Sequence, residues 1–197
     1  MGPSRGASGT VRPVQFHTHF FLGWLLPWRA LDSRRDRVIV TLAGVAPDID
    51  GIALLGGKEA FAKYHHVYTH HLAGALLAAA AGFAWGRRRW ATAGFAAGAW
   101  LLHLFCDLVG AGERYEDGTY AYPLPLLFPF SSRPFDPFPW SWNLASWQNL
   151  LVMAAALLLA GRMALREGRT PVEVLSLRAD RTVVAVLRKW CGVVPPG

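Results

Sequence analysis

The stretch WATAGFAAGAWLLHLFCDLV, residues 90–109, decides the fold of this 197-residue chain. It is almost unbroken apolar sequence and is long enough to cross a bilayer as one helix. His103 and Asp107 stand four positions apart within it, so on a helix they share one face. Because polar side chains in apolar surroundings need partners, the stretch predicts both a buried or lipid-facing helix and a functional site near its end.

Working outward, four more apolar stretches accompany this one, at residues 16–29, 38–55, 72–85 and 144–160. Residues 72–85 and 144–160 are rich in Ala and Leu and apolar on all sides, which is typical of buried or lipid-facing helices. The chain is 53% hydrophobic and only 17% charged, against roughly 25% charged in average proteins, which excludes disorder of the whole chain. The sequence therefore predicts an all-α, membrane-embedded bundle of about five helices.

The remaining segments differ from these helices in composition. Residues 1–14 are small, polar and basic, and are predicted to be a disordered tail preceding a helical membrane domain at 15–165. Residues 166–197 are predicted to be a basic tail, holding either an amphipathic helix near its end or a strand at 172–177. Residues 110–141 contain too many prolines for a regular helix and are predicted to fold over the bundle as a long Pro/aromatic lid.

The positive charge, +7 overall, is concentrated in short connections between the apolar stretches. If neighbouring helices run antiparallel, three arginine groups meet at one end of the bundle, which marks the cytoplasmic side and places the C-terminus there. These groups are Arg34, Arg35 and Arg37; Arg87, Arg88 and Arg89; and Arg162, Arg166 and Arg169. Because they do not line one helix face with interleaved aromatics, we expect membrane lipid and not nucleic acid as the partner.

The chemistry-bearing residues gather at the opposite end. All seven histidines lie in or beside apolar stretches, at His17, His19, His65, His66, His70, His71 and His103. The same helix alternation brings the start of 16–29, the end of 38–55 with Asp48 and Asp50, the segment 65–71 and the end of 90–109 together. Imidazole and carboxylate ligands without a thiolate suit a divalent metal, with Zn first and Mn or Fe as alternatives, bound as one or more ions.

Each motif alone has a simpler explanation. The histidines of 65–71 can start a helix or sense pH, the aspartates after Pro47 can cap a turn, and His103 can simply hydrogen-bond Asp107. Their conjunction in four segments favours a metal site. In that site Asp48 or Asp50 could bridge two ions or act as general base, the arrangement used for phosphoester hydrolysis.

The ordered motifs resemble the bacterial inner-membrane metal-dependent hydrolases of the YdjM type. The motifs are THFFLG (18–23), GVAPDIDG (44–51), HHVYTHHLAGALL (65–77), HLFCDLVG (103–110) and PLLFPFSSR (125–133). The resemblance implies a metal site at His19, Asp48, Asp50, His65, His70, His103 and Asp107. His66 stands where that family has Arg and His71 where it has Ser, so the roles of these two residues stay open, as does that of the extra His17.

The same resemblance implies location in the bacterial inner membrane and, through a distant similarity to zinc-dependent phospholipase C enzymes, hydrolysis of a phosphoester. The substrate is then a small-molecule or lipid-linked phosphoester, with Arg133 as a candidate for holding its anionic group. The alternative is a non-catalytic metal-binding membrane protein with a structural, handling or sensing role. An open metal position facing a cleft favours catalysis, whereas a closed ligand shell favours the alternative. A third hypothesis, a proton or ion pathway, requires a water-lined route between both faces.

Overall fold

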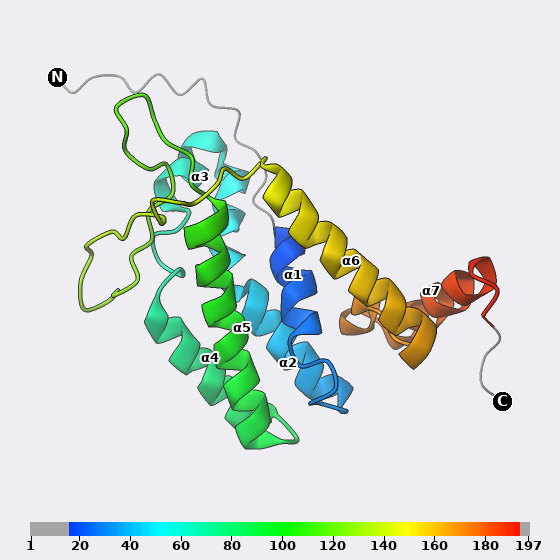
Figure 1. The fold of residues 1–197 in the computed structure, drawn as a ribbon. Helices are drawn as coiled ribbons and strands as arrows, with labels where there is room; N and C mark the ends of the chain where they lie inside the picture. Colours follow the sequence, from blue (N-terminus) through cyan, green and yellow to red (C-terminus); the bar gives the residue numbers. More distant parts are fainter. Residues whose placement is uncertain (1–15, 194–197) are drawn as a thin grey trace.

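The fold is known from a computed structural model that describes residues 16–193, so the predicted tail at 1–14 lies outside the described residues. All the regular elements of the described part are helices, which confirms the all-α prediction (Figure 1). The elements are α1 (Phe16–Leu25), α2 (Arg34–Val45), the 3₁₀ helix η1 (Ala46–Gly56), α3 (Lys58–Tyr64), α4 (Leu72–Trp85), α5 (Arg89–Gly110), α6 (Trp147–Glu167), the 3₁₀ helix η2 (Pro171–Val174) and α7 (Leu177–Trp190). Each of the five apolar stretches forms a helix, and α3 and α7 are additional.

Helix α2 changes character at Pro47. Proline lacks an N–H and clashes with the carbonyl one turn earlier, so the chain leaves the α-helix and continues as η1. Together α2 and η1 form a segment of 23 residues that is long and apolar enough to cross a membrane, as are α5 and α6. These are the three such segments within the described residues, and α4 is a shorter apolar helix.

Small residues allow the helices that carry the site to pack closely. A Cβ atom at Gly82 of α4 would lie 2.8 Å from the backbone of Ala93 in α5. At Gly74, near the start of α4, a Cβ atom would lie 1.9 Å from the ring of Trp100. Only glycine fits at these two contacts, and close approach through small residues is how helices associate where lipid removes the hydrophobic driving force.

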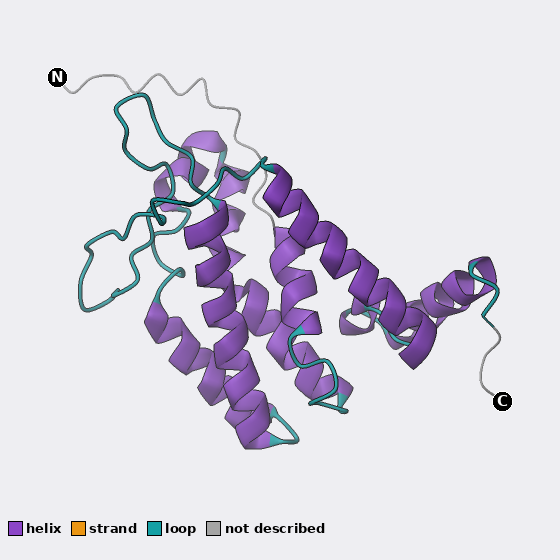
Figure 2. Cartoon of the chain, viewed as in Figure 1, coloured by secondary structure: helices purple, strands orange, loops and turns teal. Residues whose placement is uncertain are grey.

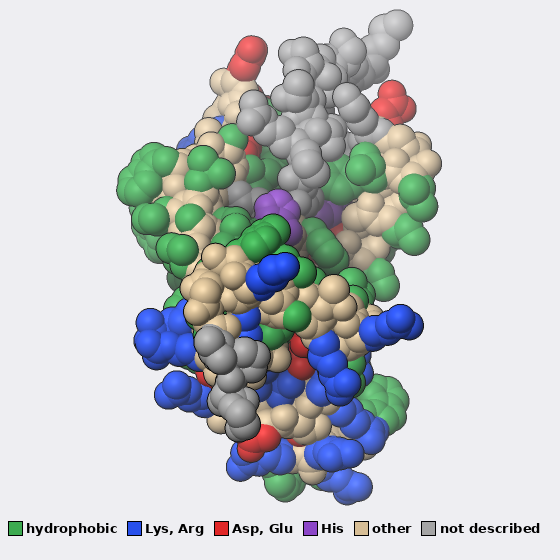
Figure 3. All heavy atoms as spheres, turned by 90° about the vertical axis from the view of Figure 1, so that its right-hand side faces the viewer, with side chains coloured by type: hydrophobic (Ala, Val, Ile, Leu, Met, Phe, Trp, Pro, Cys, Tyr) green, Lys and Arg blue, Asp and Glu red, His purple; other side chains and the backbone are tan. Residues whose placement is uncertain are grey.

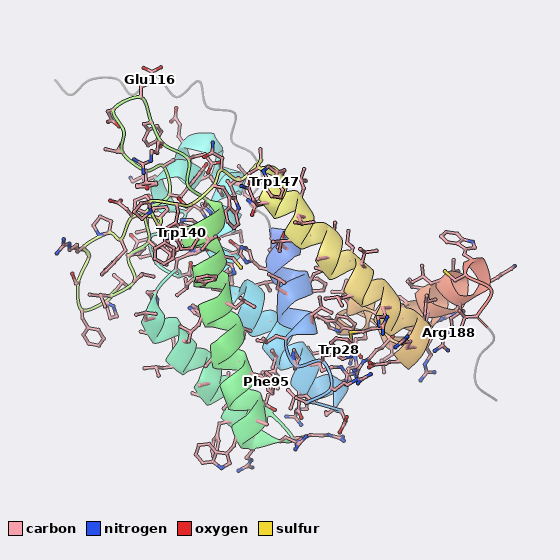
Figure 4. The ribbon with its side chains drawn as sticks, viewed as in Figure 1. Trp28, Phe95, Glu116, Trp140, Trp147 and Arg188 are labelled. Atoms are coloured by element: carbon pink, nitrogen blue, oxygen red, sulfur yellow. The ribbon has the colours of Figure 1, made fainter. Side chains whose placement is uncertain are left out.

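The arginine groups meet at one end, as the antiparallel prediction required. The buried carboxylate of Asp36, in the first turn of α2, accepts hydrogen bonds from the backbone N–H groups of Arg87 at 2.6 Å and Arg88 at 3.3 Å. The end of α6 reaches the same region, where the Trp28 indole donates to Glu167 at 2.6 Å. Trp28 therefore lies towards the arginine end, whereas Trp140 and Trp147 lie at the opposite end (Figure 4).

The segment after α6 is docked on the bundle. Arg37 of α2 donates to both carboxylate oxygens of Glu173 in η2, at 2.7 and 2.6 Å, and the Trp24 indole donates to the same carboxylate at 2.9 Å. All three side chains are buried. The amphipathic-helix prediction is confirmed by α7, and the alternative of a strand at 172–177 is wrong, because Pro171 starts a 3₁₀ turn there. The domain boundary at 165 stays a prediction.

Large apolar side chains cover the outside of several helices. Leu55 of η1, Leu77 of α4 and Leu158 of α6 are 88%, 68% and 75% exposed. Helix α6 packs against α1 and α7 and leans away from α5 in Figure 1. From the side shown in Figure 3, hydrophobic side chains occupy the upper part and cationic ones the lower part. Exposed apolar area of this extent is typical of a lipid-facing surface.

The long loop between α5 and α6 is irregular, as its prolines predicted (Figure 2). Isolated bridges pair Arg114 with Tyr120 and Leu124 with Phe135. The Leu124 side chain is fully buried in the core, and the carbonyl of Leu126 accepts from the first N–H of α4. The loop is therefore anchored to the end of the bundle that carries the histidines.

Candidate metal centre

The last turns of α5 supply His103 and Asp107, whose nearest side-chain atoms, Nε2 and Oδ2, are 3.2 Å apart. The His103 Nδ1–H donates to the carbonyl oxygen of Gly44 at 2.8 Å. A carbonyl can only accept, so this contact fixes the proton on Nδ1 and leaves the lone pair of Nε2 directed at the centre.

Helix α1 places His19 on the other side of Asp107. The His19 Nε2 atom lies 3.2 Å from Asp107 Oδ1, and the imidazole rings of His19 and His103 stack with centroids 3.7 Å apart. Gly23 and Gly44 make this possible, because a Cβ atom at Gly44 would lie 3.1 Å from the Cα of Gly23. The close α1–α2 contact therefore brings the His19 ring into the same site.

The segment before α4 contributes His70, which is fully buried. Its Nε2 atom lies 3.2 Å from His103 Nε2 and 3.5 Å from Asp107 Oδ2. Asp48 of η1 completes this group, with Oδ1 at 3.7 Å from both Nε2 atoms. Ligand atoms that each lie about 2.0–2.1 Å from one tetrahedral zinc ion are about 3.3 Å apart, so these separations fit a shared cation.

Asp50 lies behind this group and connects its histidines. Its carboxylate accepts from His65 Nδ1 at 2.8 Å, from the backbone N–H of His66 at 2.7 Å and from His70 Nδ1 at 3.3 Å. A carboxylate that holds the far nitrogen of a ligand histidine fixes its tautomer and orientation. Asp50 and His65 therefore lie in an outer layer around the converging atoms.

His66 has a backbone conformation that is rare outside glycine, with φ at +65°. Its ring is buried, stands 4.0 Å from the His70 ring between centroids, and has both nitrogens without a hydrogen-bond partner. The ring of Tyr122, in the long loop, lies 5.8 Å from the His66 ring between centroids. Burial, reinforced by the neighbouring histidines, holds the pKa of His66 well below its usual value. The ring is therefore neutral and can offer a nitrogen lone pair to a metal ion.

Several buried nitrogen and oxygen atoms of the cluster have no hydrogen-bond partner, which is unusual for a polar core that holds no metal ion. Both oxygens of Asp48, Oδ2 of Asp107 and the two ring nitrogens of His66 are buried without a hydrogen bond. Such atoms are costly unless something binds them. Two groups of three residues have ligand atoms close enough to hold an ion, one made of His19, Asp48 and His103 and the other of His66, His70 and Asp107. The donor set fits divalent metals that accept nitrogen and oxygen ligands.

A proton would compete with any metal ion for the imidazole of His70. Burial alone would disfavour a charged imidazole at His70, but the carboxylates of Asp48, Asp50 and Asp107 raise its pKa to about 9. A cation placed between the Nε2 atoms of His70 and His103 would replace that proton.

Five of the residues singled out in the sequence thus converge directly: His19, Asp48, His70, His103 and Asp107. His65 and Asp50 adjoin them. His17 is exposed, and His71 instead caps α4 by accepting from the backbone N–H of Gly74 at 3.0 Å. Arg133 is exposed in the long loop, where its backbone N–H donates to Ser131, and its role stays a prediction.

Sequence reasoning left His66 open and missed Tyr122 and Thr69. The Thr69 hydroxyl donates to the carbonyl of Pro47 at 2.5 Å and stands 3.3 Å from His70 Nδ1, so it joins the segment before α4 to η1. The threonine between the histidines was the available signal for this contact. The positive φ of His66 has no signal in the residue types.

Fold and site together define a helical membrane protein with a buried His/Asp cluster at the end of the bundle opposite its arginines. Residues 14–189 match the YdjM inner membrane protein family, and the chain belongs to that family. The match extends well beyond the motifs at 18–133 and includes α6 and most of α7. No curated protein and no solved structure gives a significant match to the sequence.

Proposed function

We propose that the protein is a metal-dependent hydrolase that acts on a phosphoester at the membrane. The observation that carries this proposal is a cavity of about 140 Å³ whose lining includes His19 and Asp107, two of the converging residues. A purely structural metal site has a closed ligand shell, whereas a catalytic one keeps a position that substrate can approach. The cavity supplies such an approach.

A divalent ion bound here would polarise a phosphoryl oxygen and make a water molecule more acidic. The chain's own residues have separable tasks beside it. Asp48, whose two oxygens have no hydrogen-bond partner, is the better placed general base. Asp50 already accepts three hydrogen bonds, and its task is to hold His65 and His70 in orientation. The exposed Arg133 is the candidate for contacting an anionic group.

The second candidate is a metal-binding membrane protein without catalysis. It is favoured by the number of donors, because six side chains in two groups could satisfy a coordination shell without water or substrate. In either case we propose a multi-pass protein of the inner membrane, with the arginine end and C-terminus cytoplasmic and the His/Asp cluster at the other end.

The test uses the full chain in nanodiscs, loaded with zinc or manganese. Its substrates are p-nitrophenyl phosphate, bis-p-nitrophenyl phosphate and phosphatidic acid. We expect hydrolysis of at least one, lost on chelation and in Asp48→Asn. His17→Ala is the matched control, because His17 is on the same helix as His19 but is exposed. Bound metal in the absence of any hydrolysis would favour the non-catalytic candidate.

A further inference from the structure

The cavity beside the cluster is lined mainly by apolar surface, and His19 and Asp107 of the cluster are among its lining residues. Its remaining lining comes from α1, α5, α6 and the end of the long loop, and includes Phe105, Cys106, Val109, Trp142, Leu144 and Val152. Asp107 and His19 are the only titratable imidazole or carboxylate groups among these lining residues. A ligand that enters therefore passes hydrocarbon surface before it reaches the ligand atoms.

The polar groups in the wall are already engaged. The Asn149 amide donates to the carbonyl oxygens of Gly110 at 2.9 Å and Leu144 at 3.0 Å, and its oxygen accepts from the Trp142 indole at 2.8 Å. These contacts fix the start of α6 to the end of α5. They also leave the amide and indole with little capacity to bind a polar ligand, so the wall offers mainly apolar contact.

The cavity lies between two helices that can span a membrane. Phe105 of α5 and Val152 of α6 both line it, and their side chains are 51% and 36% exposed. Beyond its start, α6 packs mainly on α1 and α7, and it leans away from α5 (Figure 1).

The size of the cavity limits what it can enclose. At about 140 Å³ it resembles cavities that hold a benzene-sized group, and it is smaller than the roughly 300–1,000 Å³ that encloses a whole small molecule. A larger substrate must leave most of its atoms outside, against Phe105 and Val152. Those atoms then lie at the side of two candidate spanning helices, which is where lipid acyl chains are.

From this we infer that the cavity between α5 and α6 is a lateral opening to the membrane that binds a lipid phosphoester. The phosphoester lies at the His19 and Asp107 end, and an acyl chain extends past Phe105 and Val152 into the bilayer. This inference rests on the proposed function for the phosphoester part. The lipid part rests on the cavity walls and on the two flanking helices.

The first test is crosslinking, which needs no turnover. Phosphatidic acid with a diazirine on its acyl chain is incorporated in phosphatidylcholine nanodiscs with the full chain, and crosslinked peptides are mapped by mass spectrometry. We expect crosslinks to the peptides that contain Phe105 and Val152. Val152→Trp, which fills the opening, should lose them and keep its metal content. Leu150→Trp is the matched control, because Leu150 is 69% exposed on the same helix and does not line the cavity.

The second test separates this inference from the proposed function. If the protein hydrolyses both phosphatidic acid and p-nitrophenyl phosphate, Val152→Trp should reduce the lipid reaction more than the reaction of the smaller substrate. An equal loss of both reactions, or crosslinks spread evenly over all the lipid-facing helices, would overturn the lateral opening and leave the hydrolase proposal standing. Crosslinks confined to the opening without any hydrolysis would support lipid binding and count against the hydrolase.

Discussion

His70 and His103 approach each other with their Nε2 atoms 3.2 Å apart, although the two residues come from separate segments of the chain. The other nitrogen of each ring is held by an acceptor, Asp50 for His70 and the Gly44 carbonyl for His103. Two lone pairs that face each other at this distance repel unless a proton or a metal ion lies between them. The pair is therefore the most sensitive reporter of what the cluster binds.

Substituting His103 by Ala should remove bound metal, because it deletes one of the converging nitrogens. With free metal about 100-fold above its Kd, binding stabilises the folded state by about 2.7 kcal/mol, or roughly 5–10 °C in Tm for a chain of this size. We expect EDTA to lower the Tm of the wild-type protein and leave that of His103→Ala unchanged. Elemental analysis checks the metal content, and His17→Ala should behave as wild type. Full metal content in His103→Ala would contradict the assignment.

Metal affinity should rise with pH up to about 9. The pKa of His70 in the metal-free protein is raised to about 9, so at pH 7 its ring holds a proton that a metal must displace. Each unit of pH below 9 should therefore weaken binding by about tenfold for this one proton. Calorimetric titrations in buffers of different ionisation enthalpy should detect the released proton. An affinity independent of pH between 6 and 9 would show that His70 is not displaced.

Asp48 and Asp50 should respond differently to the same change. Asp50→Asn disturbs the layer that orients His65 and His70, and changes of this kind typically weaken metal binding by about 10- to 100-fold. Asp48→Asn removes a carboxylate whose oxygens have no other partner, so it should abolish turnover and lose more affinity than Asp50→Asn. Zinc titration of both variants with a chromophoric chelator provides the comparison. Equal losses of zinc affinity would contradict the assignment of Asp48 to the converging ligand atoms and of Asp50 to the residues that orient them.

Glu173→Ala should destabilise the fold without touching the cluster. The change leaves the buried Arg37 guanidinium uncompensated and the Trp24 indole without its acceptor, and breaking a buried pair in this way costs about 3–5 kcal/mol. Thermal unfolding in detergent measures the loss. Glu116→Ala is the control, because Glu116 is exposed in the long loop, at the end of the bundle opposite Trp28 (Figure 4). Replacing both Arg37 and Glu173 by apolar residues should recover part of the stability.

The two ends of the bundle should lie on opposite sides of the membrane. A fluorescent protein fused after residue 197 should fluoresce in the cytoplasm, because the arginine end is predicted to be cytoplasmic. Alkaline phosphatase inserted at Glu116, in the loop at the opposite end, should be active in the periplasm. Reversed signals would overturn the orientation, and equal signals from both positions would contradict a spanning bundle.

Much of the site followed from helix alternation alone. Antiparallel neighbours bring the start of α1, η1 and the end of α5 to one end, so His19, Asp48 and His103 could be grouped from sequence order. The layering of the site could not be predicted, because whether a carboxylate faces the centre or the back of an imidazole depends on backbone turns. The positive φ of His66 is one such turn, and the backbone N–H of His66 donates to Asp50, 16 positions earlier in the chain.

The docking of the C-terminal segment was also beyond the sequence. In the sequence, Glu173 looks like an ordinary charged residue in a mixed tail. Its carboxylate accepts hydrogen bonds from Arg37 and Trp24, which lie 136 and 149 positions earlier in the chain. By contrast, the amphipathic spacing of α7 is local and could be read directly. Local periodicity was thus informative, whereas a single long-range ion pair had no signal.

The hydrogen bonds from Arg87 and Arg88 to Asp36 have a consequence at the far end of the molecule. They fix the longitudinal offset between α2 and α5. With a rise of about 1.5 Å per residue, an offset of one residue would shift Asp48 relative to His103 by about two-fifths of the 3.7 Å between Asp48 Oδ1 and His103 Nε2. Coordination chemistry tolerates far less than that. The hydrogen bonds at Asp36 therefore determine how accurately the His/Asp cluster at the opposite end of the bundle is assembled.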